Sequence, residues 1–238
     1  TGSRIVMTDT IMIPGHLQHR YDTCIKQVAI GKWTNLTILA VHDPDVLIDA
    51  INPEDFQEEE RLPYWAEIWP SAIGLGIHLF EHPARLEAPV LELGCGTGVA
   101  GLAAVRAGLT VHACDYEEDA LAFARHNAHV NELSDRMTFR HLDWRKPDLS
   151  DQYPLIFGSD IVYERPDHGP IIDLLERTLI PGGTFLLSDP DRRPAVAFIT
   201  AMTDYGYRHT PQPRRIRYDD TVSKVTVHRF IKPGTRIL

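Results

Sequence analysis

The chain has 238 residues, of which 43% are hydrophobic and 24% charged, and a formal net charge of −9 at pH 7. This length and composition predict a globular protein with a substantial core, and the negative charge argues against broad nucleic-acid binding, which needs a basic surface. Cys24, Cys95 and Cys114 lack metal-ligand spacing and indicate free thiols in a reducing compartment. The longest apolar stretch, residues 90–111, is interrupted by charges. We therefore expect a cytoplasmic protein without a metal site or a membrane partner.

We expect residues 1–61 to form an N-terminal extension. Cys24–Ile30 and Leu36–Val41 are apolar or alternating runs on either side of a glycine, a pattern typical of a β-hairpin. Asp45–Ile51 favours a short helix, and the acidic run at 54–61 indicates a solvated loop or helix face.

We expect residues 62–238 to form a second domain. Its first element is an aromatic-rich helix that begins near Pro70, and strands and helices alternate after it. The strands are expected, in chain order, at Val90–Leu93, Thr110–Cys114, Met137–Leu142, Leu155–Ser159 and Thr184–Leu187. The helices are expected at Val99–Ala107, Glu117–Asn131, Asp167–Ile180 and Pro194–Tyr205.

Two further features complete this domain. Pro181-Gly182-Gly183 is expected to end the helix Asp167–Ile180 before the next strand. Arg208–Tyr218 and Thr221–Ile231 indicate a long antiparallel hairpin with a turn at Asp219-Asp220. Repeated βα units closed by a hairpin predict an α/β fold, a doubly wound sheet with an antiparallel edge.

A glycine-rich turn follows the first strand of this domain, where residues 91–98 read Leu-Glu-Leu-Gly-Cys-Gly-Thr-Gly. Glycines without a Cβ let a ligand lie against the main chain, next to the free N–H groups of a helix start. Asp115 ends the following strand, where a parallel sheet places a partner for ribose hydroxyls. The pattern therefore predicts a nucleoside site.

Two cofactors fit this pattern. Gly96-x-Gly98-x-x-Gly101 matches the dinucleotide fingerprint, which alone is a weak signal. Glu92-x-Gly94-x-Gly96-x-Gly98 instead places a carboxylate just before the turn, where it would repel a pyrophosphate and suit a ligand with a cationic amino-acid end. Residues 91–98 resemble the first motif of the seven-strand methyltransferases, and this favours S-adenosylmethionine over NAD.

Aspartates follow four of the expected strands, at Asp115, Asp143, Asp160 and Asp189. Each alone is explained equally well as a helix cap. Because the carboxyl ends of parallel strands meet at one edge of a sheet, the four together indicate a binding site at that edge.

The chain resembles methyltransferase family 16, the seven-strand protein-lysine methyltransferases. Asp160-Ile161-Val162-Tyr163 matches the family's motif of an acidic residue, two variable positions and an aromatic, and 63–70 (Pro-Tyr-Trp-Ala-Glu-Ile-Trp-Pro) is similar to its tryptophan motif. With Asp189-Pro190-x-Arg192 and the closing hairpin, the resemblance is strongest to the branch that methylates the β subunit of electron-transfer flavoprotein. It covers residues 62–230 and implies a seven-strand, Rossmann-like methyltransferase sheet.

The resemblance also implies roles for single residues around S-adenosylmethionine. The methionine part would be held by Glu92, Gly94, Gly96 and Gly98, and the ribose by Asp115. The adenine would be bordered by Asp143 and Trp144. The N-terminal side would be covered by Trp69, and Ser159 would approach the ligand through its backbone. Either tryptophan is also explained as a core aromatic.

On the acceptor side, a lysine ammonium must lose its proton before methyl transfer, and an aromatic pocket of low dielectric constant lowers its pKa. We expect Asp160 to orient the incoming amine by accepting a hydrogen bond and Tyr163 to wall the channel. Tyr64 and Trp65 would complete an aromatic cage for a cation.

Two weaker features remain. His168 at a helix start is a candidate base, although a surface role explains it better, and the arginines at 214, 215 and 217 are candidates for contact with an acidic partner. The function expected is S-adenosylmethionine-dependent N-methylation of a protein lysine. The alternatives are a small-molecule amine methyltransferase on the same scaffold, a dinucleotide-dependent oxidoreductase, and a protein that binds cofactor or partner without catalysis.

Overall fold

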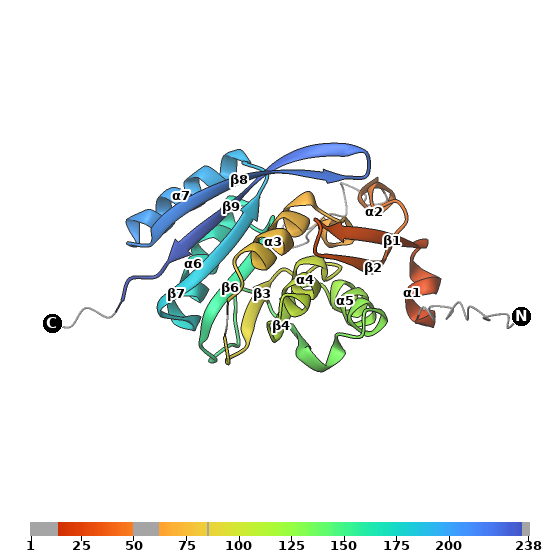
Figure 1. Cartoon of the computed structure of the whole chain (residues 1–238), viewed down its shortest axis with the longest axis horizontal. Helices are drawn as coiled ribbons and strands as arrows, with labels where there is room; N and C mark the ends of the chain where they lie inside the picture. Colours follow the sequence, from red (N-terminus) through yellow and green to blue (C-terminus); the bar gives the residue numbers. More distant parts are fainter. Residues whose placement is uncertain (1–13, 50–61, 85, 235–238) are drawn as a thin grey trace, which may run out of the picture.

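A computed structural model describes residues 14–49, 62–84 and 86–234. Its centre is a seven-stranded sheet with the order β5-β4-β3-β6-β7-β9-β8 (Figure 1). The strands are β3 (Val90–Leu93), β4 (Val111–Asp115), β5 (Met137–His141), β6 (Tyr153–Ser159), β7 (Leu179–Asp189), β8 (Arg208–Tyr218) and β9 (Thr221–Ile231). β5, β4, β3, β6 and β7 pair in parallel, and β9 lies antiparallel between β7 and β8. The chain moves outward in opposite directions from β3 and β6, so a ligand crevice is expected between their carboxyl ends.

Helices cover both faces of this sheet (Figure 1). The helices on one face are α3 (Pro70–Glu81), α4 (Val99–Arg106) and α5 (Glu118–Val130), and those on the other are α6 (His168–Thr178) and α7 (Arg193–Asp204). Short 3-10 turns lie at Tyr64–Ala66, Ser134–Arg136 and Arg165–Asp167. In the central strands, residues on opposite faces contribute to the two cores. In β3, Val90 belongs to the core with α3 and α4, whereas Leu91 belongs to the core with α6 and α7. None of the helices in these ranges is long and apolar enough to cross a bilayer.

The N-terminal part forms α1 (Gly15–Arg20), the antiparallel hairpin β1 (Thr23–Ile30) and β2 (Thr34–Val41), and α2 (Asp45–Asp49). The hairpin is not a detached unit. Val28, Ile30, Leu36 and Ile38 are fully buried in the core that α3 and α4 share. The predicted boundary between residues 61 and 62 borders a segment outside the described residues, so the division into two domains stays a prediction.

Asn127 of α5 and Asn131, which caps the end of that helix, bind the free edge of β2. The side chain of Asn127 accepts a hydrogen bond from the Leu39 N–H (2.7 Å) and donates one to the Leu39 carbonyl (3.0 Å). Asn131 makes the same pair of bonds with Thr37, at 3.0 and 2.7 Å. Each amide thus replaces a neighbouring strand for one residue of the hairpin.

The predicted hairpins, helices and strands are confirmed to within a few residues, with one exception described below. The C-terminal hairpin has the predicted bounds, and both turn residues, Asp219 and Asp220, have positive φ angles (46° and 57°), as a tight two-residue turn requires. The expected helix Asp45–Ile51 is present as α2, and its last two residues, like the acidic run 54–61, lie outside the described part.

The exception is the end of α6. The predicted helix to Ile180 is wrong there, because α6 ends at Thr178 and β7 begins at Leu179 and continues through the Pro-Gly-Gly segment. The ammonium of Lys232, far along the chain, donates a hydrogen bond to the Leu179 carbonyl (3.0 Å) at the helix terminus. Gly182, at φ 76°, donates its N–H to the carbonyl of Lys232 (3.2 Å), so the segment bulges within the sheet instead of leaving it.

Candidate active site

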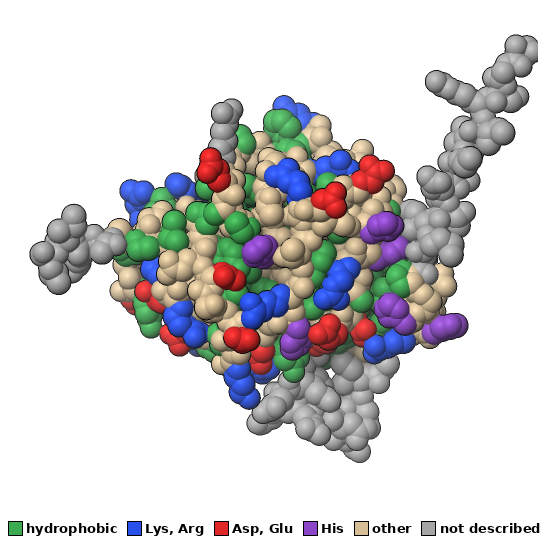
Figure 2. Space-filling view, turned by 90° about the horizontal axis from the view of Figure 1, so that it is seen from below, with side chains coloured by type: hydrophobic (Ala, Val, Ile, Leu, Met, Phe, Trp, Pro, Cys, Tyr) green, Lys and Arg blue, Asp and Glu red, His purple; other side chains and the backbone are tan. Residues whose placement is uncertain are grey.

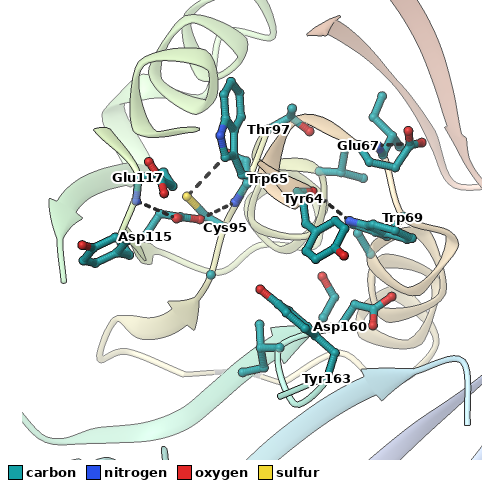
Figure 3. Close-up of a pocket in the computed structure, with 18 of the residues that line it drawn as sticks. Tyr64, Trp65, Glu67, Trp69, Cys95, Thr97, Asp115, Glu117, Asp160 and Tyr163 are labelled. Carbon is teal, nitrogen blue, oxygen red and sulfur yellow. Dashed lines mark hydrogen bonds between the residues drawn. The ribbon is translucent and has the colours of Figure 1, made fainter. Parts of the chain in front are cut away.

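A pocket lies at the carboxyl ends of β3, β4 and β6, at the reversal in strand order (Figure 3). Most of the predicted site residues line it. They are Trp69, Gly94, Gly96, Asp115, Trp144, Ser159, Asp160 and Tyr163. The fold therefore brings together side chains from the segment before α3, from the glycine loop and from three strand ends, and this supports the predicted location of the site.

Three predicted cofactor residues do not line the pocket. Glu92 points from β3 toward α4, where its carboxylate bonds the backbone of Gly101. Gly98 caps the start of α4 at φ 91°. Asp143 forms an ion pair with Arg145, whose Nε lies 3.0 Å from the Asp143 Oδ1. Direct contact of these three residues with a cofactor stays a prediction.

Glu92 is a buried acid beneath the glycine loop, only 2% exposed, and its Oε2 has no hydrogen-bond partner within the described part of the chain. Burial raises the pKa of this carboxyl to about 8, and the nearby charge of Asp115 adds to the shift. The close approach requires a glycine on α4, because a Cβ on Gly101 would lie 2.1 Å from Oε2.

The glycine loop is tight for the same steric reason. Gly94 and Gly96 have φ angles of 64° and 51°, and a Cβ on Gly94 would lie 2.8 Å from a side-chain carbon of Ile161. Asp115 holds the loop in place, since its carboxylate accepts hydrogen bonds from the N–H of Gly96 (2.8 Å) and from the N–H of Glu117 (3.0 Å). The carboxylate is thereby fixed at the floor of the pocket.

These features fit S-adenosylmethionine. Gly94 and Gly96 let a ligand lie directly against the backbone, and Asp115 offers carboxylate oxygens at the end of β4 for a ribose diol. Trp144, 5% exposed, supplies an apolar wall of the kind that an adenine ring needs. The acidic floor suits a ligand without phosphates.

Aromatic rings surround the other end of the pocket (Figure 3). Tyr64 packs edge-on against Tyr163, with ring centroids 5.4 Å apart, and against Trp69 at 6.2 Å. The Trp69 Nε1 donates a hydrogen bond to the Tyr64 carbonyl (3.0 Å), which fixes the indole at this end of the pocket. The predicted cage thus gains Trp69 and Tyr163, while Trp65 lies at the cofactor end beside Tyr21.

Asp160 lies between these rings and a basic residue that the sequence reading left without a role. Its carboxylate accepts two hydrogen bonds from Arg192, at 2.8 Å from Nε and 3.1 Å from Nη2. The Asp160 backbone has a φ angle of 56°, unusual for a residue with a side chain. Strain of this kind is found at functional sites, where the surrounding structure enforces it.

Arg192 could not be paired with Asp160 from the sequence, because 32 positions separate them. The available signal was its place three residues after the strand-end Asp189, whose Oδ1 accepts the Arg192 N–H (2.7 Å). Burial raises the pKa of Asp189 to about 6. Arg192 therefore joins the loops after β6 and β7.

The weaker candidates lie outside the pocket. His168 is buried, its Nε2 is 3.0 Å from the carbonyl oxygen of Val162, and its ring packs on Phe198, so a structural role fits it better than that of a base. On β8, Arg214 faces α3 and pairs with Glu81 at 2.7 Å.

Residues 54–204, more than half of the chain, match the sequence profile of the lysine methyltransferase family. The chain belongs to the lysine methyltransferase family. The predicted family is therefore confirmed, and its membership supports S-adenosylmethionine as the methyl donor.

Two curated relatives illustrate the similarity. The chain is 35% identical over 138 residues to the protein N-lysine methyltransferase METTL21A of Danio rerio, covering 55% of this chain and 62% of that protein. It is 31% identical over 137 residues to the electron transfer flavoprotein beta subunit lysine methyltransferase of Xenopus laevis, covering 55% of this chain and 53% of that protein. The chain thus spans less than two thirds of either relative.

A solved structure shows the same fold. The ribosomal protein L11 methylase of Lactobacillus delbrueckii subsp. bulgaricus superposes with a TM-score of 0.60 at 16% identity, covering 87% of this chain and 98% of that one. The prediction of a doubly wound, Rossmann-like methyltransferase sheet with an antiparallel hairpin is confirmed.

Proposed function

We propose that this protein is an S-adenosylmethionine-dependent N-methyltransferase that acts on a protein lysine. The observation that carries the proposal is the family match over residues 54–204, which includes both the glycine loop and Asp160–Tyr163. The two motifs face one pocket, at opposite ends of it (Figure 3).

At the cofactor end, S-adenosylmethionine supplies a methyl group on a positively charged sulfur. Gly94 and Gly96 would bind its amino-acid part through their backbone, with Glu92 supporting the loop from below. Asp115 would accept hydrogen bonds from the ribose hydroxyls, and Trp144 would pack on the adenine. The roles of Gly94, Gly96, Asp115 and Trp144 are consistent with the pocket lining.

At the acceptor end, Tyr64, Trp69 and Tyr163 would form an apolar channel that excludes water and disfavours a charged amine. Asp160 would accept a hydrogen bond from the acceptor amine and so orient the lone pair of the amine nitrogen toward the methyl group. The protein's main contribution is then orientation of two reactants at close range.

The relatives' names specify protein lysines, which supports a protein acceptor here, with a small-molecule amine as the alternative. We do not expect a nucleic-acid substrate, because the net charge is −9 and, on the face in Figure 2, acidic and basic side chains are interspersed. The buried free thiols of Cys95 and Cys114 are consistent with a cytoplasmic location.

The first experiment is calorimetric titration of S-adenosylmethionine, S-adenosylhomocysteine and NAD(H) into the protein. We expect the first two to bind and Asp115→Ala to weaken them about 10- to 100-fold, the equivalent of one or two lost hydrogen bonds to a charged group. Glu118→Ala, which removes an exposed carboxylate at the nearby start of α5, should change neither affinity.

Binding of NAD(H) in place of these ligands would contradict the proposal. With the cofactor established, transfer of a labelled methyl group to lysate proteins and to small amines distinguishes the two acceptor classes. Label found only on small amines would leave the methyltransferase assignment intact and overturn the protein acceptor.

A further inference from the structure

The pairing of Asp160 with Arg192 bears on the protonation state of the acceptor amine. The Asp160 side chain is 3% exposed and the Arg192 side chain 37%, and the guanidinium binds both carboxylate oxygens. Bidentate pairs of this kind fix geometry as well as charge. The carboxylate keeps lone pairs on the sides that the guanidinium does not use.

The guanidinium also occupies the face of an aromatic ring at the acceptor end. Its central carbon lies 5.4 Å from the centroid of Trp69, within the range of a cation–π contact. One cation-binding surface of the site is therefore already filled by a residue of the chain itself.

Both acidic and basic side chains lie near the Asp160–Arg192 pair. The titratable and charged groups that face it or line the same end of the pocket are Tyr64, Glu67, Tyr163, Asp189 and Asp191. From the β9 side, Lys224 pairs with Asp191 at 2.7 Å, and His228 lies near the same carboxylate. Without Arg192, Asp160 and Asp189 would form a local excess of negative charge.

Such an excess works against methyl transfer to an amine. An ammonium has no lone pair, so it must release its proton, here to water, before its nitrogen attacks. The N–C bond then forms as the C–S bond breaks, and the bonding electron pair moves to sulfur. An unpaired carboxylate beside the nitrogen stabilises the ammonium and opposes the first of these steps.

We propose that Arg192 is a positioning residue that holds Asp160 in place and cancels its charge, so that the acceptor site receives the free amine rather than the ammonium. The inference rests on the proposed function and adds to it a residue and a physical role. Asp160 then acts as a fixed hydrogen-bond acceptor within a neutral pair.

The test needs no identified acceptor. Two analogues of S-adenosylhomocysteine carry nitrogen in place of sulfur, one with an aminoethyl group on it and the other with a propyl group of equal length. Only the first places an amine at the acceptor position. The affinities of both analogues are measured calorimetrically between about pH 6 and pH 10, the range over which a perturbed amine titrates. The ratio of the two affinities removes the pH effects of protein groups that act on both analogues alike.

For the wild-type chain, selectivity for the aminoethyl analogue should rise with pH. Arg192→Met should move this rise to higher pH by about one unit, which is about a tenfold loss of selectivity for the free amine at a fixed pH. Asp160→Asn should move it the opposite way. Arg192→Lys, which keeps the charge, should retain the wild-type profile, as should Arg193→Met, a change at an exposed neighbour.

Opposite shifts in Arg192→Met and Asp160→Asn support the proposal, since a merely structural pair would move both variants in the same direction or neither. An unshifted Arg192→Met profile overturns it, and if that variant does not fold, an unshifted Asp160→Asn profile does so. S-adenosylhomocysteine, which carries no amine at this position, is titrated alongside. Its failure to bind the wild-type chain would overturn the proposed function itself.

Discussion

The position of Glu92 in the sequence motif and its position in the folded chain suggest different roles. Its place just before the glycine turn marks the motif in the sequence, whereas in the folded chain the carboxyl lies behind the loop against Gly101 and away from the pocket lining. A buried acid with an unpaired oxygen destabilises the fold once it ionises. Ionisation of the Glu92 carboxyl should therefore make the free energy of unfolding depend on pH.

We predict that Glu92→Gln stabilises the protein at alkaline pH. The folded-state pKa, about 8, lies above the ordinary value of 4.5, so the folded chain binds more protons in this window and its free energy of unfolding falls as pH rises through it. Glutamine never ionises, so the variant should gain up to about 5 kcal/mol at about pH 9, which corresponds to the rise of the Glu92 pKa from 4.5 to about 8. Below about pH 4.5 the difference should vanish, because the protonated acid and the amide both place a donor at the same atom.

Thermal unfolding followed across this pH range measures the effect, with the exposed Glu118→Gln as the matched control. A stability difference that stays constant with pH would show that Glu92 is not a titrating buried acid.

At the scale of elements, α5 connects the N-terminal hairpin to the glycine loop. Besides its bonds to Leu39 in β2, the amide of Asn127 donates to the carbonyl of Thr97 (2.9 Å), which lines the pocket. Asn131 contacts the hairpin in the same way, but its further hydrogen bond goes to the Asn127 carbonyl (2.7 Å) and not to the glycine loop. Both residues hold the hairpin, but only Asn127 also supports the glycine loop, so substituting each in turn distinguishes the two roles.

We predict that Asn127→Ala and Asn131→Ala each lower the free energy of unfolding by about 2–4 kcal/mol, because buried backbone groups lose their partners. Only Asn127→Ala should also weaken S-adenosylhomocysteine binding, by about tenfold, since it frees the glycine loop. Denaturant unfolding and calorimetry measure the two effects. Equal affinity losses in both variants would contradict a specific support of the loop by Asn127.

The sequence located the elements well where neighbouring residues specify them. The C-terminal hairpin has its turn residues and alternating strands in one continuous segment, and the prediction was confirmed there. The end of α6 depends instead on Lys232, which bonds the Leu179 carbonyl from 53 positions away. No local pattern contains that information.

At the scale of the whole molecule, the N-terminal hairpin belongs to the main core. The hairpin β1–β2 lies beside α3 and α4 (Figure 1), and its residues Ile30, Leu36 and Ile38 are fully buried in the core there. Burying such a side chain contributes about 1.5–3 kcal/mol, and a whole domain is stable by only about 5–15 kcal/mol. Losing the hairpin removes a large part of that margin.

We predict that a chain reduced to residues 62–238 lacks a cooperative thermal transition, as measured by circular dichroism against the full chain. Ile38→Ala should by itself cost about 2–4 kcal/mol, whereas Ile25→Ala, at a position 41% exposed on the same hairpin, should cost less than about 1 kcal/mol. A stable, cooperative 62–238 fragment would instead support the two-domain division predicted from the sequence.

The sequence by itself determined the fold class, the family and the edge of the sheet at which the site lies. Strand and helix periodicity, the glycine turn of residues 91–98 and the aspartates at strand ends are local patterns, and parallel strands bring their ends together in any such sheet. Tertiary structure decided which of these residues face the pocket, that Arg192 pairs with Asp160, and that the hairpin shares the core. These depend on contacts between segments tens of residues apart, which the packing of the whole chain creates and no short stretch of sequence encodes.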